Sequence, residues 1–496
     1  MIHGVIRTGA LLAAALGVAA GVRGEAAPTA AEAAALREKV MPGVCRITAQ
    51  NAWGVPLAYA NGFLLGQGRF VITDLGAVGR PGVAQVAFQF SDGTAGASKQ
   101  FGLADPALGL AALLVEGESA ARPGLDLAAD MPAIEGGLTV TLAGWRWCKD
   151  SDAVSLRLGR GPSARELAQR CGVEAPGAAD VFLRVEGPRF DGAAGAPVVD
   201  RQGAVLAVRI DLAARDLVAA LAVPASSFRK TLLAAQPELK AITELPKPLW
   251  PARILRIPGE PLSQQDFANT VRDLKAAMVC ERCGGTGVIK GADKGLVRRL
   301  LGGDKPGDGE CPACHGDKIA YRPLVYTLFS TMVLEATRVA WSPVADEKTR
   351  SAVHTSAAAM LKQLGQANVI TFQLPLAFAG WGDAGNLRKA LPRGAILYGE
   401  VAETAEGPDG KYLLLGPYGA APSVAVRADL LAGPAAKGVP ARKLPSAGDR
   451  IVLAGAVLGP FKAPTQQGLY VLPLDWAPAP GEMPEPDPRG KPKPKR

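Results

Sequence analysis

Short stretches in which apolar and polar residues alternate fill the chain from about residue 40 to residue 235. Gly, Pro and Asp separate these stretches, as they do in turns between strands. The stretches that read most clearly as strands are Gly43–Thr48, Gly62–Leu65, Phe70–Thr73, Val83–Phe90, Leu138–Ala143, Val181–Val185 and Ala204–Ile210. Many short segments at this spacing predict an all-β barrel or sandwich.

A helical period replaces the alternation after Gln236–Leu262, a linker that contains six prolines. Ser263 and Asp266 fit an N-cap with an acid at the third helical position. Apolar residues then recur at intervals of four, three and four, which predicts one buried helix face: Phe267, Val271, Leu274 and Met278. Two more apolar-rich stretches, Tyr321–Trp341 and Ala345–Leu364, predict further helices.

Strand-like stretches return between Val369 and Trp476. They are Ile370–Leu374, Ala395–Ala402, Tyr412–Leu415, Val424–Arg427, Ile451–Leu458 and Leu469–Leu472. Five or six strands in this length predict a small β-barrel, and a helical interlude near Ala428–Leu431 gives an order that resembles an OB-fold. From Ala477 onward the chain is rich in proline and then basic, which predicts a disordered tail.

The chain has 496 residues, too many for one hydrophobic core, so we expect several domains. Its 55 basic residues exceed its 46 acidic residues and give a net charge of +9. Part of this excess lies in the last eight residues, RGKPKPKR, which we interpret as a solvated end. Contact of this tail with nucleic acid or an anionic surface is the alternative.

The first 24 residues have the pattern of an export signal. Arg7 supplies the positive start, Ala10–Val22 is a short apolar run, and the small residues Gly24 and Ala26 follow it. The run is shorter than a membrane span requires. We therefore expect an exported protein of the periplasm or cell envelope, with no transmembrane span after signal cleavage.

Four cysteines form two C-x-x-C pairs, Cys280 with Cys283 and Cys311 with Cys314, separated by 27 residues. Glycines follow both pairs and let the backbone curl tightly. Four thiolates from two such knuckles make the closed tetrahedral site of structural Zn²⁺. The first pair, CERCGGTG, resembles the repeat of the DnaJ-type cysteine-rich zinc domain. One full and one truncated repeat imply a single Zn²⁺, and the absence of a J-domain motif leaves co-chaperone activity unsupported.

Other chemistries fit the same cysteines. The sequence CPACH at residues 311–315 also matches the C-x-x-C-H motif of covalent haem attachment. A disulfide or a redox dithiol is a third option in an oxidising compartment. The paired knuckles favour Zn²⁺, with His315 outside the ligand set. Elsewhere, Cys148 and Cys171 are a candidate disulfide, and buried free thiols are the alternative.

Four segments of the first half resemble trypsin-like serine proteases of the HtrA/Deg type. GFLLGQGRFVITDLGAV (residues 62–78) is similar to the segment that carries the catalytic histidine, and ADPALGLAALLV (104–115) to the one that carries the aspartate. DGAAGAPVVDRQGAVLAV (191–208) resembles the segment around the nucleophile. LAVPASSFRKTL (221–232) resembles the closing strand and helix. The resemblance implies a trypsin-like double β-barrel.

The same resemblance places glycine or alanine at each triad position: Gly76 for the histidine, Gly109 for the aspartate and Ala194 for the serine. Acyl transfer needs a nucleophile, a base and a group that orients the base, and these residues supply none of them. We therefore predict a non-catalytic domain. Backbone N–H groups around Gly192, Ala193 and Ala194 remain candidates for a binding cleft that holds a polypeptide partner.

The sequence therefore predicts a multidomain, mainly β protein with a helical insert. Its segments are a signal peptide (1–24), a trypsin-like domain (35–235), a linker (236–262), a helical module with zinc knuckles (263–366), an OB-like barrel (367–476) and a basic tail (477–496). Non-catalytic binding or scaffolding of a polypeptide is the predicted function. The alternatives are a hydrolase or thiol/redox enzyme with its site elsewhere, and a nucleic-acid-binding protein that uses the OB-like barrel and basic segments.

Overall fold

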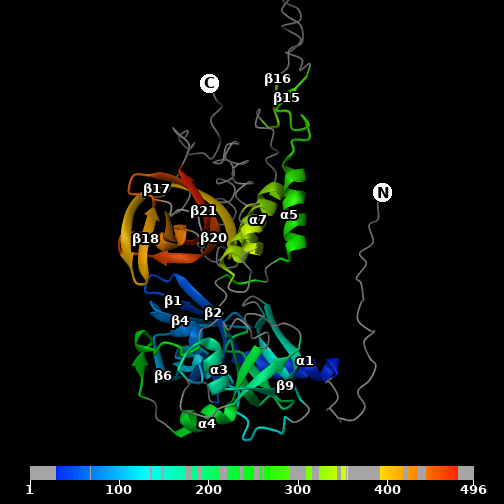
Figure 1. Ribbon diagram of the computed structural model, residues 1–496, viewed down its shortest axis with the longest axis vertical. Helices are drawn as coiled ribbons and strands as arrows, with labels where there is room; N and C mark the ends of the chain where they lie inside the picture. The colour runs from blue at the N-terminus through cyan, green and yellow to red at the C-terminus, as the bar shows by residue number, and fades with distance from the viewer. Residues whose placement is uncertain are drawn as a thin grey trace, which may run out of the picture.

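The computed structural model describes most of the chain between Thr29 and Pro478. Figure 1 shows the N-terminal strands as a lower body, the C-terminal barrel above it, and two helices beside that barrel. Strands dominate, so the mainly β fold class is confirmed. The described residues are 29–66, 69–134, 137–146, 150–174, 181–187, 193–212, 220–234, 238–250, 257–259, 262–290, 309–314, 323–342, 348–353, 355, 391–416, 423–432 and 443–478.

The lower body begins with helix α1 (Ala30–Val40) and an eight-stranded antiparallel sheet in the order β14-β6-β7-β3-β2-β1-β4-β5. Along β1 the residues Cys45, Ile47 and Ala49 are fully buried, and the residues between them are half-buried, so the alternation predicted from the sequence is confirmed. The strands are β1 (Val44–Gln50), β2 (Pro56–Leu65), β3 (Phe70–Asp74), β4 (Gln85–Phe90), β5 (Ala95–Ser98), β6 (Gln100–Asp105), β7 (Leu110–Leu114) and β14 (Lys240–Ala241).

A closed six-stranded barrel, in the order β10-β13-β12-β11-β8-β9, completes the lower body. One apolar cluster joins it to the first sheet, with Phe63 and Ile72 from the sheet packed against Val208 and Phe228 from the barrel side. This pair of strand-rich units confirms the predicted double-barrel architecture. The elements are β8 (Leu138–Arg146), β9 (Asp150–Ser163), α3 (Ala164–Cys171), β10 (Val181–Glu186), β11 (Pro197–Val199), β12 (Val205–Ile210), β13 (Ala220–Pro224) and α4 (Ala225–Ala234).

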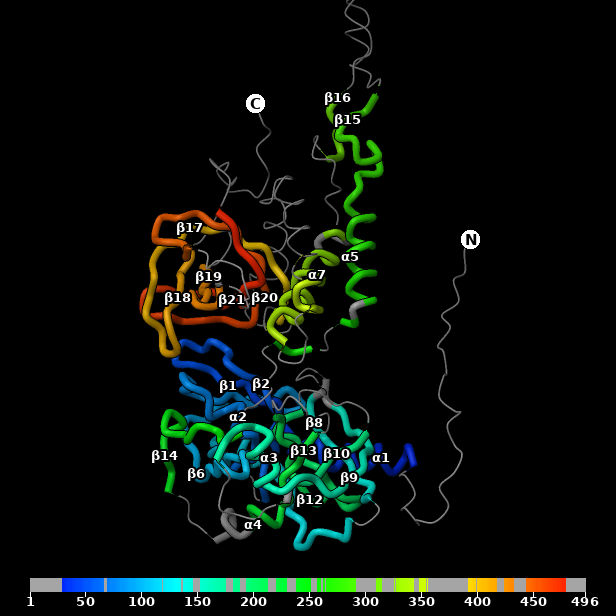
Figure 2. Tube along the Cα trace, in the orientation of Figure 1, coloured from blue at the N-terminus to red at the C-terminus, as the bar shows by residue number. Residues whose placement is uncertain are grey.

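The helical module contains α5 (Gln264–Met278) and α7 (Pro323–Trp341), which pack side by side (Figure 2). Ser263 caps α5, and its hydroxyl accepts a hydrogen bond from the Asp266 N–H, as the sequence predicted. The far end of α5 leads to a two-stranded ribbon, β15 (Val288–Ile289) and β16 (Gly309–Glu310). Within the third predicted helix, the structure describes only residues 348–353 and 355, which are helical, so His354 lies outside the described residues.

The C-terminal unit is a closed five-stranded barrel in the order β17-β18-β19-β21-β20. Neighbouring strands are antiparallel except β19 and β21, which run parallel. The predicted strand Ile370–Leu374 lies outside the described residues, and the last strand runs through Pro478, two residues beyond the predicted end of the barrel at Trp476. The elements are β17 (Arg393–Gly407), β18 (Gly410–Leu415), β19 (Ser423–Arg427), the short helix η4 (Ala428–Ala432), β20 (Arg450–Lys462) and β21 (Gln467–Pro478).

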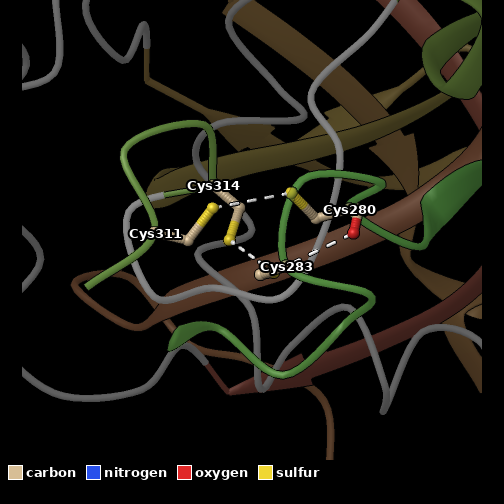
Figure 3. Close-up of side chains that lie close together, drawn as sticks. All are labelled: Cys280, Cys283, Cys311 and Cys314. Atoms are coloured by element: carbon tan, nitrogen blue, oxygen red, sulfur yellow. Dashed lines mark hydrogen bonds between the residues drawn. The ribbon is translucent and has the colours of Figure 1, made fainter. Parts of the chain in front are cut away.

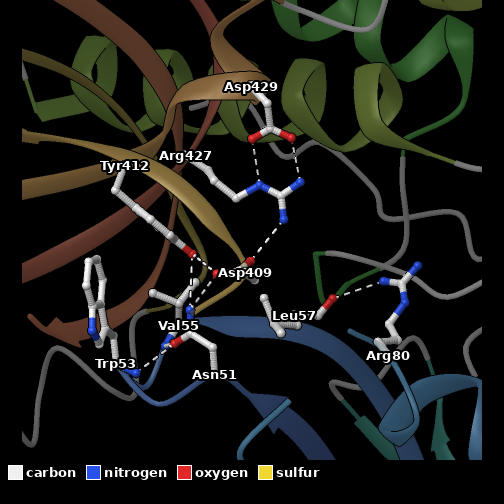
Figure 4. A network of polar contacts seen from close by, with 9 residues as sticks. All are labelled: Asn51, Trp53, Val55, Leu57, Arg80, Asp409, Tyr412, Arg427 and Asp429. Atoms are coloured by element: carbon white, nitrogen blue, oxygen red, sulfur yellow. Dashed lines mark hydrogen bonds and ion pairs between the residues drawn. The ribbon is translucent and has the colours of Figure 1, made fainter. Parts of the chain in front are cut away.

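The C-terminal barrel rests on the first sheet through the turn between β17 and β18 (Figure 4). Asp409 in this turn approaches Gly82 so closely that a Cβ at residue 82 would lie 2.5 Å from the Asp409 Cβ. The rings of Trp53 and Tyr412 are 5.0 Å apart across the contact. The backbone N–H of Lys462 also donates to the Trp53 carbonyl at 2.9 Å. The C-terminal barrel and the first sheet are therefore in direct contact, with both side-chain packing and backbone hydrogen bonding.

Candidate functional site

Gly76 lies in the short helix α2 (Leu75–Val78), where Asp74 is the N-cap. The Gly76 N–H donates to one Asp74 carboxylate oxygen at 2.6 Å. The other oxygen accepts from the N–H of Asp211, which follows strand β12 of the second barrel, at 3.0 Å. Asp74 therefore fixes the start of α2 and links the two strand-rich units.

Gly109 lies in the turn before β7 and has a φ of +72°, a conformation that glycine adopts without steric cost. Its carbonyl accepts a hydrogen bond from the Leu75 N–H at 2.8 Å. Gly76 and Gly109 line one small cavity together with Asp74 and Asp211. The structure thus brings together two of the three positions that the sequence predicted for the triad.

Trp250, which the sequence assigned to the linker, occupies this cavity wall. Its side chain is 2% exposed and packs edge-on against Phe182, with ring centroids 5.7 Å apart. The indole N–H donates to the Ala107 carbonyl at 2.7 Å. A Cβ at Gly109 would lie 3.3 Å from the indole, so the missing side chain makes room for the tryptophan. The remaining space is about 10 Å³, less than a substrate needs.

The boundary between the first sheet and the six-stranded barrel is called the seam below. Ala194 lies at this seam, against strands β2 and β3, and is 3% exposed. Its carbonyl accepts from the Asn61 N–H at 2.7 Å. The next residue, Gly195, has a φ of +80°, and a Cβ there would lie 2.1 Å from the Asn61 carbonyl oxygen and 2.8 Å from the Thr73 hydroxyl. This turn is therefore pressed closely against the first sheet.

The backbone around Ala194 bears on the predicted binding cleft. Ala193 is fully buried, and Gly192 lies outside the described residues. The N–H groups of Gly195 and Ala196 donate to the carbonyls of Arg209 and Ala193, at 2.7 and 2.9 Å. Neither of these two N–H groups is therefore available to a bound peptide. The binding cleft formed by the backbone N–H groups of residues 192–194 stays a prediction.

Asp74 is the acidic group at the centre of this seam. Burial raises its pKa to about 7, and the nearby Asp211 charge adds to the increase, while the backbone hydrogen bonds oppose it. Both carboxylate oxygens already accept backbone N–H groups, and the side chain is buried. A carboxyl with a raised pKa is typical of acid–base sites, but this one has only about 10 Å³ of space beside it.

The cysteine cluster lies beyond the end of α5, where the structure brings all four predicted ligands together (Figure 3). The Sγ atoms of Cys280 and Cys311 are 3.9 Å apart, and those of Cys283 and Cys314 are 3.7 Å apart. All four Sγ atoms lie within 4.8 Å of one another. A tetrahedral ion with Zn–S bonds of about 2.3 Å requires sulfurs about 3.8 Å apart. The cluster therefore fits one metal ion of this kind.

Backbone hydrogen bonds hold the two knuckles in place. Strand β15 pairs with β16, and the Cys311 N–H donates to the Gly287 carbonyl at 2.9 Å. The Gly287 N–H donates to the Cys283 sulfur at 3.3 Å, and Gly287 has a φ of +80°. Burial raises the pKa of Cys283, but this N–H and the neighbouring thiols outweigh it and lower the pKa to about 6. The knuckle thus favours a thiolate.

The other cysteine predictions lie partly outside the described residues. His315, which belongs to the alternative haem motif, and Cys148, half of the candidate disulfide, are both outside them. Cys171 is half-buried at the end of α3. Cys45 is fully buried, which raises the pKa of its thiol and makes it inert at neutral pH.

Comparisons with known proteins give likenesses at the level of structure. No protein-family model matches the sequence, and no curated protein matches it. The chain is similar to the Rv3671c protease from M. tuberculosis in its active form, with 19% identity over 46% of this chain and 96% of that chain and a TM-score of 0.35. It is also similar to Deg5, with 17% identity over 40% and 91% of the two chains and a TM-score of 0.32. At these values neither likeness bears on activity.

Proposed function

We propose that this chain is an exported, non-catalytic trypsin-like protein that carries one structural Zn²⁺ and binds or scaffolds a polypeptide partner. The observation that carries the proposal is the seam between the two strand-rich units. Gly76 and Gly109 stand there without reactive atoms, and Trp250 fills the space beside them. Ala194 stands at the position of the nucleophile.

A hydrolase of this type needs a hydroxyl, a base and open space for the scissile bond. Asp74 is an acid near the expected place, but its oxygens hold the α2 N-terminus and the Asp211 backbone. Thr73 has a hydroxyl near Gly195, but it is buried and donates to the Asn61 carbonyl at 2.7 Å. Both groups therefore have structural partners, which supports a scaffold over an enzyme.

Zn²⁺ is the metal that the thiolate set favours, because a closed tetrahedral set of four sulfurs is its usual structural site. Cys280, Cys311 and Cys314 are buried, which suits a structural ion with no open position. Two exposed valines flank the cluster: Val279 is 45% exposed and Val288 is 38% exposed. They are two of the four large apolar residues that are exposed among the described residues, and we propose that the partner contacts them.

The C-terminal barrel supports the OB-like interpretation through its strand order, in which the third and fifth strands run parallel. In OB-folds the loop between the first two strands helps to bind oligonucleotides. Here Asp409 of that loop is buried against the first sheet. This docking disfavours the nucleic-acid alternative, at least by the usual OB route.

Export rests on the signal pattern of residues 1–24, which lie outside the described residues. Among the described helices, none is both long and apolar enough to cross a bilayer. The proposed location is the periplasm or cell envelope.

The test combines a fluorophosphonate probe with metal analysis on the purified full chain. We expect no labelled serine, about one zinc per chain and no Soret band. The variant Ala194→Ser is the matched control, and it should also stay unlabelled because glycine, Gly76, stands at the position predicted for the base. Labelling of a serine in the unmodified chain would contradict the non-catalytic assignment. A Soret band would show that the cysteines bind haem and not zinc.

A further inference from the structure

A cavity of about 290 Å³ lies where the C-terminal barrel meets the first sheet. At about 30 Å³ for each water molecule in the liquid, it has room for about ten heavy atoms. Contacts between domains are frequent places for small-molecule sites. The cavity is far larger than the space of about 10 Å³ at the seam, so the described chain offers a ligand more room here.

The cavity has an apolar wall and a polar wall. Leu430, Leu458 and Leu472 of the C-terminal barrel, with Pro56 and Leu57 of the first sheet, supply the apolar surface. Such a surface favours the hydrocarbon part of a ligand, because contact removes apolar area from water.

The polar wall holds two guanidinium groups, one from each barrel, and one carboxylate. Arg80 is held at the wall by a hydrogen bond from its Nη1 to the Leu57 carbonyl at 3.1 Å (Figure 4). Arg427 comes from the end of β19 on the opposite side. The lining therefore carries two positive charges and the negative charge of Asp409, and Asp429, which lies outside the lining, also pairs with Arg427.

The Asp409 carboxylate is already neutralised within the protein. One oxygen accepts from Asn51 Nδ2 at 2.9 Å and from the Tyr412 hydroxyl at 2.6 Å, and the other accepts from Arg427 Nη1 at 2.9 Å. Its side chain is only 3% exposed. A carboxylate that is paired in this way repels an incoming anion weakly.

Arg427 retains capacity for a ligand. A guanidinium has five N–H groups, and the bonds from Arg427 to Asp409 and Asp429 use one on each of its three nitrogens. The second N–H groups of Nη1 and Nη2 are not used by these carboxylates. An anion that lies between Arg80 and Arg427 would receive charge-assisted hydrogen bonds, which are the strong ones.

We propose that this cavity binds a small organic anion whose apolar body lies against the leucines and whose anionic head lies between Arg80 and Arg427. Since Arg80 belongs to the unit of the first sheet and Arg427 to the C-terminal barrel, the ligand also connects these two units. Binding at this place is independent of the triad-equivalent seam and of the cysteine cluster.

Three fluorinated probes with one body and different heads test the proposal by fluorine NMR on the full chain. They are para-fluorophenylacetate, its neutral amide, and the cationic para-fluorophenethylammonium. We expect the anion to bind at least about tenfold more tightly than the other two, because only its head accepts charge-assisted hydrogen bonds from the guanidinium groups. Equal affinity for the three heads would overturn the proposal.

Variants then locate the site. Arg80→Gln should weaken binding of the anion about tenfold and remove the preference for its charge. Leu430→Phe should block all three probes by filling the cavity, with the fold checked by the thermal unfolding midpoint. Arg272→Gln, on an arginine whose side chain is 72% exposed on α5, is the matched control and should change nothing. No binding of the anion, or binding that Arg80→Gln and Leu430→Phe leave unaltered, would overturn the assignment.

Discussion

Substitution of Asp409 by alanine should loosen the contact between the first sheet and the C-terminal barrel. Asp409 is the common acceptor for Asn51 of the first sheet and for Tyr412 and Arg427 of the C-terminal barrel. Burial raises the pKa of Tyr412, and its hydrogen bond to Asp409 raises it further, so the phenol stays a donor at all accessible pH. Alanine would leave three donors without this acceptor.

The loss in free energy depends on which hydrogen-bond partners each of the three donors keeps in Asp409→Ala. Removing one partner of a buried ion pair costs about 3–5 kcal/mol. Arg427 keeps its bidentate pair with Asp429, and the adjoining cavity admits water to the other two donors. We therefore expect a loss near the lower bound, about 3 kcal/mol in the free energy that opens the contact. At about 1.4 kcal/mol for each factor of ten, this is about a hundredfold in the opening equilibrium.

Native-state hydrogen exchange measures this opening directly. Peptides that cover residues 51–57 and 408–415 should exchange about a hundredfold faster in Asp409→Ala. The strands of the six-stranded barrel, β8–β13, should keep their protection. Asp429→Ala is the matched control, because Asp429 is 59% exposed and its pair contributes about 0–1 kcal/mol. Equal exchange in the two variants would refute the central role of Asp409.

Three further predictions concern the seam and the metal. Trp250→Ala should lower the free energy of unfolding by about 3–5 kcal/mol, measured with denaturant, and still leave the chain inert to a fluorophosphonate. The Asp74 carboxyl binds its proton more tightly in the folded state, so its contribution to the free energy of unfolding should fall by up to about 4 kcal/mol as pH rises from 3.8 to about 7. Asp74→Asn should remove that slope from a pH series of unfolding curves, and an unchanged slope would contradict the raised pKa. A chelator should release about one zinc and abolish exchange protection at residues 280–290 and 309–314, while β17–β21 keep theirs, and protection that survives metal loss would count against a structural ion.

Periodicity predicted much of this fold because it reflects burial within single elements. Along β1 the alternation of buried and half-buried residues is visible in the sequence, and Phe267, Leu274 and Met278 lie on the buried face of α5 as their spacing requires. The four cysteines were also predictable, because two knuckles need only short local turns to present their sulfurs. These features depend on neighbours along the chain.

Contacts between distant segments were not predictable from the same patterns. Trp250 was one apolar residue among the prolines of a linker, and nothing near it indicates that it packs against Phe182. Asn61 and Asp74 appeared only as polar residues within or after strands, yet each bonds across the seam. A buried polar residue at the end of a predicted strand is the one signal that suggests such a role.

The glycine at residue 109 and the closure of the seam are physically coupled. The indole of Trp250 lies 3.3 Å from where a Cβ at Gly109 would project, so a larger side chain there competes with the tryptophan for one volume. Gly109 also has a φ of +72°, which a side chain with a Cβ rarely adopts. An aspartate at residue 109 would therefore have to displace Trp250 and strain the turn whose carbonyl accepts from the Leu75 N–H. A cleft in this state is stabilised as part of the core, and that is why we assign this part of the chain a scaffolding role.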